Sequence, residues 1–267
     1  MNGRKKINKS SLKNKPLLEA IFEIKWNYKK KTLDENPMKN FDPNYKLLIG
    51  TLYDKIKSKY EYHESLPTSE IPDMLISGIV QHRFRVEKDK WPLVQVGPGV
   101  LTINDTENYS WKDFKEGILF VTKSFYDVYP EKDKIVIKNL TLRYINAMEF
   151  DFKKDDIFKF LKDKMKTNIE LRPSLFEVNC IEKSPKAFDW RFSYSCKKPK
   201  SILTLRFFKG ERSDGTTGLL WEMIVQSVDK EVPKIPEKMR EWLEGSHDII
   251  EDWFFKLIEG DLQRGFE

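Results

Sequence analysis

The first half of the chain begins with a strand-like pattern of apolar residues and then changes to a helical one. Residues 16–26 end in alternating apolar and charged positions, which is typical of a half-buried strand. From Tyr45 to Tyr60, apolar residues recur at three- and four-residue spacing and predict an amphipathic helix. A similar stripe from Trp111 to Tyr129 predicts a second helix, which starts at the N-cap residue Ser110 and stops at Pro130.

Between the two predicted helices, residues 76–86 and 91–104 have extended patterns. The charged turn Glu87-Lys88-Asp89-Lys90 separates them, so the pair predicts a hairpin. Gly97-Pro98-Gly99 interrupts the second run. Because neither proline nor paired glycines suit a central strand, we expect a bulge or tight bend at this point and two short strands around it.

The second half has the same order of elements, without a repeat of residues. A long strand is predicted over residues 135–151, and a short helix over about residues 155–166 with Asp155 as its cap. Four extended runs then predict an antiparallel meander; they lie near residues 174–183, 187–196, 201–209 and 218–228. A long helix after Pro236 closes the chain, and its apolar stripe is suited to packing across a sheet.

Both halves therefore have the order strand, helix, several antiparallel strands, long helix. This order predicts an α+β fold with a curved antiparallel sheet and helices packed on one face. Two arrangements stay open: two β-α-β(n)-α halves that are TATA-binding-protein-like (TBP-like) or helix-grip, or one continuous sheet. The expected division is a basic flexible tail at residues 1–15, a first half at 16–131 and a second half at 132–267.

A net charge of +6 favours an anionic partner, but the excess positive charge is confined to the start of the chain. The first fifteen residues contain no acidic side chain and six basic ones, namely Arg4, Lys5, Lys6, Lys9, Lys13 and Lys15, so the charges of the rest of the chain balance. Such a tail can attract phosphate or anionic lipid, but short basic termini are commonly just solvated. Lys5 and Lys6 are candidate contacts on this tail.

The remaining composition indicates a folded protein without disulfides or membrane spans. Apolar residues make up 39% and aromatic residues 13% of the chain. Cys180 and Cys196 lie in strand-like runs, where a free thiol packs as a small hydrophobe, so no disulfide framework is expected. No apolar run has the length of a membrane helix or a signal peptide, and we expect a cytoplasmic protein without membrane contact.

No set of residues forms a recognisable catalytic, metal or cofactor motif. None of the three histidines has zinc-ligand spacing to another histidine or a cysteine, and the sequence contains no phosphate loop or nucleophile elbow. We therefore expect no cofactor. His247 stands apart, because it lies between Leu243 and Ile250 on the apolar side of the last helix. Asp248 and Glu251 lie beside it. His247 is either a core histidine with one satisfied nitrogen or a general base.

Strand parity places arginines on the less apolar side of the predicted sheet. Leu142 and Tyr144 are expected to face the helices, Arg143 faces away, and Asn146 is a candidate for a buried polar side chain. The same rule leaves five arginines on the open face: Arg83, Arg85, Arg143, Arg191 and Arg206. Acidic residues share this face, namely Asp189, Glu222 and Glu149, and cross-strand ion pairs are the ordinary reason for such a mixture.

Five phrases of the sequence carry a resemblance to a known family. They are Pro16 to Ile24, Trp91 to Gly99, Tyr109-Ser110-Trp111, Leu142 to Asn146 and His247 to Phe254. In this order they resemble a sporadically distributed family of uncharacterised bacterial proteins of similar length. The resemblance implies no activity, cofactor or catalytic residue. A patchy distribution is typical of genes that move with mobile elements, including anti-phage and toxin–antitoxin loci, so a defence-related role is expected by association.

These observations lead to a first hypothesis of a non-enzymatic binding or scaffold protein that contacts a protein partner with its sheet face or its helical layer. The alternative is a nucleic-acid-binding module that captures RNA or single-stranded DNA with the basic tail and the five arginines. An enzymatic function needs a cleft in which His247, Asp248 or Glu251 is accessible.

Overall fold

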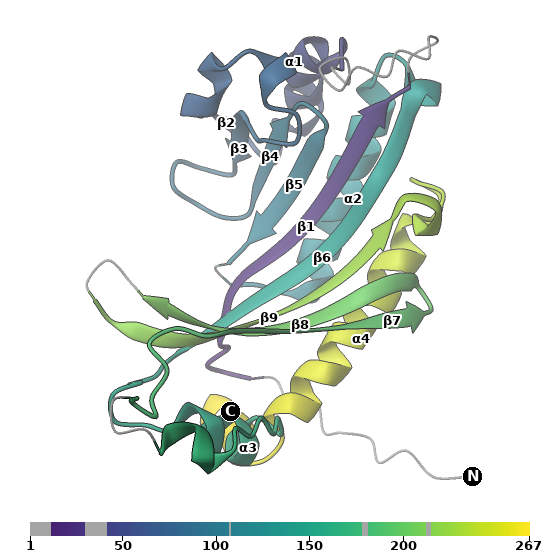
Figure 1. The fold of residues 1–267 in the computed structure, drawn as a ribbon. Helices are drawn as coiled ribbons and strands as arrows, with labels where there is room; N and C mark the ends of the chain where they lie inside the picture. Colours follow the sequence, from purple (N-terminus) through teal and green to yellow (C-terminus); the bar gives the residue numbers. More distant parts are fainter. Residues whose placement is uncertain (1–11, 30–41, 107, 178–180, 212–214) are drawn as a thin grey trace.

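The computed structural model describes residues 12–29, 42–106, 108–177, 181–211 and 215–267. In these ranges, nine strands form one antiparallel sheet in the order β2-β3-β4-β5-β1-β6-β9-β8-β7 (Figure 1). The first half contains β1 (Leu17–Tyr28), α1 (Tyr45–Ile56), β2 (Tyr62–Ser65), β3 (His82–Arg85), β4 (Leu93–Gly97), β5 (Val100–Asp105) and α2 (Trp111–Val128). The second half contains β6 (Ile135–Glu149), α3 (Ile157–Lys164), β7 (Asp189–Lys197), β8 (Lys200–Glu211), β9 (Thr217–Val228), α4 (Met239–Ile258) and α5 (Asp261–Phe266).

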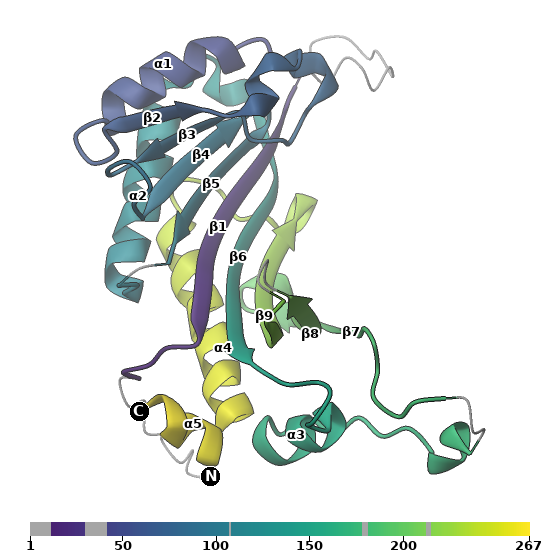
Figure 2. The ribbon, with the colours of Figure 1, turned by 90° about the vertical axis from the view of Figure 1, so that its left-hand side faces the viewer.

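The predicted fold class is confirmed. Helices α1, α2 and α4 cover one face of the curved antiparallel sheet, and Figure 2 views the molecule from the opposite, open side. Each half has the order β-α-β(n)-α, and β1 of the first half pairs with β6 of the second along its whole length. The two arrangements left open by the sequence are therefore not alternatives, because two similar halves form one continuous sheet.

The centre of the sheet is held by apolar side chains that alternate along β1. Its helix-facing side chains are 2% exposed or less, and they are Ala20, Phe22, Ile24 and Trp26. The ring centroid of Phe22 lies 6.3 Å from that of Trp242 in α4, and the centroid of Trp26 lies 4.9 Å from that of Phe125 in α2. Full burial of one such side chain contributes about 1.5–3 kcal/mol. One strand thus anchors the long helices of both halves.

Helix α2 forms as its sequence predicts. The Ser110 hydroxyl caps it by accepting a hydrogen bond from the backbone N–H of Asp113 at 3.2 Å. The apolar stripe, represented by Phe114 and Ile118, is buried against the sheet. The helix ends at Val128 with Tyr129 as its C-cap, and Pro130, which cannot continue a helix, follows.

The bend expected at Gly97-Pro98-Gly99 is a tight hairpin between β4 and β5. Gly99 has a φ of +76°, a conformation that L side chains rarely adopt. Gly97 is needed for a different reason, because a Cβ atom there would lie 1.9 Å from the carbonyl oxygen of Ile79. The connection that precedes β3 therefore lies directly against the backbone of β4.

Two predicted extended runs are corrected by the structure. Residues 76–86 form a strand only at His82–Arg85, because Gly78 has a φ of +80° and turns the chain before β3. The described part of residues 174–183 contains no strand, since Pro173 instead opens the short 3-10 helix η5 (Pro173–Phe176). Strand β2 was not predicted, because its sequence Tyr-His-Glu-Ser lacks the apolar alternation that marks a strand.

The rest of the second half agrees with the prediction apart from one cap and from α5, a separate short helix at the end of the chain that was not predicted. The last three runs of the meander are β7, β8 and β9, and the closing helix begins at Met239. Helix α3 is capped by Asp156 rather than Asp155. The Asp156 carboxylate accepts hydrogen bonds from the backbone N–H groups of Phe158 at 2.9 Å and Lys159 at 3.2 Å.

The end of β5 generates a prediction about stability and pH. The Asp105 side chain is buried, and burial raises its pKa from 3.8 to about 6. Because the folded-state pKa is the higher one, the free energy of unfolding falls as pH rises from 3.8 to about 6 and stays low above that pH. We expect Asp105→Asn to stabilise the fold at pH 8, by up to roughly 3 kcal/mol, and to have little effect at pH 4.

Urea unfolding of both proteins at the two pH values measures this difference. The exposed Asp133, changed to Asn, is the matched control and should alter stability by less than about 0.5 kcal/mol at either pH. An equal gain for Asp105→Asn at pH 4 and pH 8 would contradict the assignment of the effect to ionisation.

Candidate functional site

The five predicted arginines project from the open face, but four of them are paired with carboxylates. Arg143 of β6 and Arg206 of β8 share Glu222 of β9, to which they donate from Nε at 2.6 Å and from Nη1 at 3.0 Å, respectively. Glu222 is only 1% exposed. Arg206 also donates two hydrogen bonds to Asp189, at 2.7 and 2.6 Å, and these hold the pKa of that carboxyl group below its ordinary value. The positive charge of Arg143 and Arg206 is therefore largely neutralised by carboxylates of the same sheet.

At the other end of the open face, Arg83 and Arg85 of β3 share Glu64 of β2. Arg85 donates from Nε to a Glu64 carboxylate oxygen at 3.2 Å, and Arg83 Nη1 lies 3.5 Å from the same oxygen. Arg85 is buried, with its guanidinium group 5.6 Å from the centroid of the Trp91 ring. It is a structural residue more than a free cation.

Hydrogen bonds continue from Arg83 across the neighbouring strands. Arg83 Nε donates to Gln95 Oε1 at 3.1 Å, and Asn104 Nδ2 donates to Glu19 Oε1 at 2.8 Å. Arg191 of β7 is the exception among the five arginines, because it is exposed and lies opposite Arg206. The open face is thus a hydrogen-bonded polar surface with an accessible cation near one edge.

Five further residues named from the sequence lie outside the described residues: Arg4, Lys5, Lys6, Lys9 and Cys180. Cys196 lies on β7 as a half-buried free thiol. Glu149 lies at the exposed end of β6.

A pocket of about 310 Å³, here called the His247 pocket, lies at one end of the central strands on the helix side. Its walls come from residues 12–17, from residues 109–111 at the start of α2, from β6 and β9, and from α4. These segments are far apart in the sequence. The antiparallel pairing of β1 with β6 brings the start of β1 to the end of β6, where Leu17 lies opposite Asn146.

A chain of hydrogen bonds orients His247 in this pocket. The Tyr109 and Tyr144 hydroxyl oxygens lie 2.7 Å apart, and the Tyr144 hydroxyl lies 3.1 Å from His247 Nδ1. Trp111 stacks on the imidazole ring, with centroids 3.9 Å apart and an interplanar angle of 11°. Glu251, one helical turn further along α4, lies 3.9 Å from His247 Nε2. The side chain of His247 is 13% exposed, so the ring is held firmly at the wall of the pocket.

Burial keeps both tyrosines protonated. It raises the pKa of Tyr144 well above its ordinary value and also raises that of Tyr109. The arrangement that uses every hydroxyl proton has Tyr109 donating to Tyr144 and Tyr144 donating to His247 Nδ1. In that arrangement, His247 Nε2 carries the ring proton and faces Glu251.

Asn146 also lines the His247 pocket and is 3% exposed. It belongs to the helix-facing row of β6 that contains Leu142 and Tyr144. Among the described residues, its side-chain Nδ2 has no hydrogen-bond partner. A buried donor without a partner costs about 1–3 kcal/mol, so the residue is unfavourable for stability unless something else binds there.

The sequence singled out His247 and Asn146 but did not connect them with Tyr109, Trp111 or Lys15. The signal that could have connected them was present in the phrases that carry the family resemblance. Four of those five phrases contribute to the walls of the His247 pocket: Pro16 to Ile24, Tyr109-Ser110-Trp111, Leu142 to Asn146 and His247 to Phe254.

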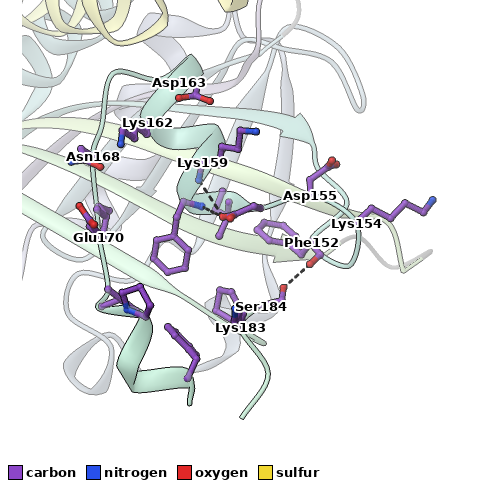
Figure 3. A pocket seen from close by; sticks show the side chains of 18 of the residues that line it. Phe152, Lys154, Asp155, Lys159, Lys162, Asp163, Asn168, Glu170, Lys183 and Ser184 are labelled. Atoms are coloured by element: carbon purple, nitrogen blue, oxygen red, sulfur yellow. Dashed lines mark hydrogen bonds between the residues drawn. The ribbon is translucent and has the colours of Figure 1, made fainter. Parts of the chain in front are cut away.

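A larger pocket of about 670 Å³ lies between α3 and the segment that follows it (Figure 3). Lysines and carboxylates alternate around it, so their charges oppose one another, and Lys154 extends away with its side chain 83% exposed. The carboxylate of Asp156 is occupied by the helix cap, and the Ser184 hydroxyl donates to the Phe152 carbonyl at 2.7 Å. We therefore regard it as a weaker candidate than the His247 pocket.

Two further properties bear on the type of site. In the described part of the chain, no three His, Cys, Asp or Glu side chains are placed to hold a metal ion. Over the same residues, none of the helices combines the length and the apolar character needed to cross a membrane.

Comparisons with known proteins add little to this description. No protein-family model matches the sequence, and no curated protein matches it. Among solved structures, a TBP from Methanococcus jannaschii aligns over 88% of this chain and 97% of its own, with 12% identity and a TM-score of 0.21. A likeness this weak carries no argument about function, and the fold description rests on the strand order itself.

The shared carboxylate on the open face generates a second prediction. We expect Glu222→Gln to lower the free energy of unfolding by roughly 3 kcal/mol, because it leaves Arg143 and Arg206 without their common counter-charge. Glu231→Gln is the control, since Glu231 pairs with an exposed Lys200 at 3.4 Å and should matter by less than about 1 kcal/mol. Urea unfolding measures both changes, and equal losses would show that the open-face network contributes no more than a surface pair.

Proposed function

We propose that this chain is a cytoplasmic, non-enzymatic binding protein that contacts a protein partner across its open face. The observation that supports this most directly is a set of large apolar side chains that are 41–60% exposed: Ile71, Leu75, Ile79, Leu171, Leu175 and Ile181. They lie on two connections, one between β2 and β3 and the other between α3 and β7. Apolar side chains gathered on exposed connections are typical of surfaces that bind other proteins.

The position of these connections supports the same proposal. Figure 2 shows them toward opposite ends of the sheet, with the open face between them. That face offers polar groups that already have partners, so a protein can lie against it without stripping water from isolated charges. Binding energy would come mainly from the apolar residues at the two ends.

The resemblance to a sporadically distributed bacterial family adds a proposal about the partner. A protein encoded by a neighbouring gene, as in a mobile or anti-phage defence locus, is the partner that we favour. The identity of the adjacent genes provides an independent check of this part.

A nucleic-acid-binding function is the second candidate, and one observation favours it. Arg191 is exposed near the edge of the open face, and a basic tail precedes the first strand. The paired state of the other four predicted arginines reduces the positive charge available for phosphate contacts, so we rank this function below protein binding.

The partner surface can be tested by placing charge at both connections. We expect the double variant Leu75→Lys, Leu175→Lys to recover at least about tenfold less of a stoichiometric partner from the native host, because it places unpaired charges in the interface. Quantitative mass spectrometry after affinity capture measures the recovery. Tyr194→Lys is the matched control, since Tyr194 is 50% exposed but lies opposite Leu203 in the helix-facing row of the outer strands, away from the open face. It should capture as much partner as the unchanged protein.

Undiminished recovery by the double variant would remove the proposed surface. A full-length chain that stays monomeric and recovers no stoichiometric partner would end the protein-binding proposal altogether.

The nucleic-acid alternative predicts a dependence on salt that protein binding does not require. We expect filter binding to RNA and single-stranded DNA to be no more than weak at about 50 mM salt and absent at about 200 mM. We also expect Arg191→Ala to change RNA affinity less than about twofold. Strong binding that falls steeply with salt and is lost in Arg191→Ala would reverse the ranking of the two functions.

A further inference from the structure

We propose that the His247 pocket binds a small aromatic molecule with a terminal carboxylate or carboxamide. The pocket lies on the helix side of the sheet, whereas the proposed partner surface lies on the open side. The two proposals therefore rest on different residues and can fail independently.

The volume and the lining of the pocket indicate the size and the apolar character of the ligand. Its volume of about 310 Å³ lies at the lower end of the usual range for small-molecule sites, about 300–1,000 Å³. Trp111, Phe254 and Phe255 contribute aromatic side chains, and Met223 and Ile250 contribute aliphatic ones. Aromatic rings gain extra attraction from offset or edge-to-face contact with other rings, so a planar aromatic body suits these walls.

Asn146 indicates that the polar group of the ligand is a hydrogen-bond acceptor. Its amide nitrogen is buried in the wall of the pocket and has no partner among the described residues, in a row of β6 that is otherwise committed to the core. A carbonyl or carboxylate oxygen in the pocket would accept the unused hydrogen bond. Binding would then remove a penalty that the empty site carries, which favours an oxygen-bearing ligand over a purely apolar one.

Lys15 provides a cation at the same pocket. Its ammonium group donates one hydrogen bond to the backbone carbonyl of Tyr109 at 2.8 Å and lies 5.9 Å from the centroid of the Tyr109 ring. An ammonium group has three donors, so this contact leaves it able to pair with a carboxylate. Glu251 in the same wall carries the opposite charge. Comparing acid, amide and amine ligands therefore shows which of the two charged side chains determines the preference of the pocket.

The chain from Tyr109 through Tyr144 to His247 gives the pocket a fixed shape. Its members are already held by one another and by the stacked Trp111 ring, so a ligand need not order them. Sites whose side chains are positioned before binding lose less entropy when the ligand arrives. In this proposal, His247 is a positioning residue of the wall and performs no chemistry.

The test uses the full-length chain and three ligands that share one ring: indole-3-acetate, indole-3-acetamide and tryptamine. Isothermal titration calorimetry and ligand-observed NMR measure the binding. We expect saturable binding of the acid and the amide, and binding of the amine that is at least about tenfold weaker, because an ammonium group cannot accept from Asn146.

Two variants separate a ligand contact from a structural role. Asn146→Leu should weaken binding of both oxygen-bearing ligands by about tenfold or more while leaving the unfolding temperature the same or higher, since it replaces an unpartnered polar group with an apolar one of similar size. A purely structural Asn146 would instead give a less stable protein. Lys15→Met should weaken binding of indole-3-acetate and leave binding of indole-3-acetamide unchanged. Lys13→Met, at an exposed position of the same segment, should change the affinity for neither ligand.

Three results would overturn the proposal: no saturable binding of the acid or the amide, binding that Asn146→Leu leaves unchanged, or tryptamine binding as tightly as the acid. A short peptide ending in phenylalanine that binds at least about tenfold more tightly than indole-3-acetate would also overturn it. That result would assign the pocket to the chain end of a protein.

Discussion

The antiparallel pairing of β1 with β6 is the interaction on which the rest of the structure depends. Each of these strands begins its half of the chain and lies at the inner edge of its half-sheet, so their pairing joins the two half-sheets. Phe22 lies opposite Leu142 and Ile21 lies opposite Arg143. Because side chains alternate between the two faces, this register makes the apolar rows of both halves continuous on the helix side. The contact between Phe22 and Trp242 then fastens the closing helix of the second half onto the strand that starts the first.

The two ends of this central strand pair differ in whether their buried polar groups have hydrogen-bond partners. At the end marked by Trp26, the buried carboxylate of Asp42 accepts hydrogen bonds from Trp26 Nε1 at 3.0 Å, from Tyr129 Oη at 2.6 Å and from the backbone N–H of Asn44 at 3.0 Å. At the opposite end, Asn146 faces a pocket with its amide nitrogen unpartnered among the described residues. One end is a closed polar centre, as stability requires, and the other retains hydrogen-bonding capacity at a cost to stability.

The open face shows why charge along a sequence is a poor guide to function. Strand parity places Arg143 and Arg206 on one face together with Asp189, Glu222 and Glu149, so either free cations or cross-strand ion pairs are possible. In the structure both arginines contact Glu222, which the register places between their strands. The parity rule placed them on the correct face because it depends only on local backbone geometry. Parity could not say which carboxylate each arginine contacts, because the neighbours of the strand that carries Glu222 are set by the topology of the whole sheet.

Local patterns were sufficient for the α+β class, for α2 with its Ser110 cap, for the hairpin at Gly97 to Gly99 and for the apolar rows of β1 and β6. Each depends on interactions within a few residues, which the sequence contains directly. Short polar β2 and the turn opened by Pro173 were missed because their conformation depends on what they lie against. His247 and Asn146 were recognised singly, whereas the pocket that unites them with Tyr109 and Lys15 exists only in the folded chain. Tertiary structure alone decided it, because antiparallel pairing brings the start of the first central strand to the end of the second.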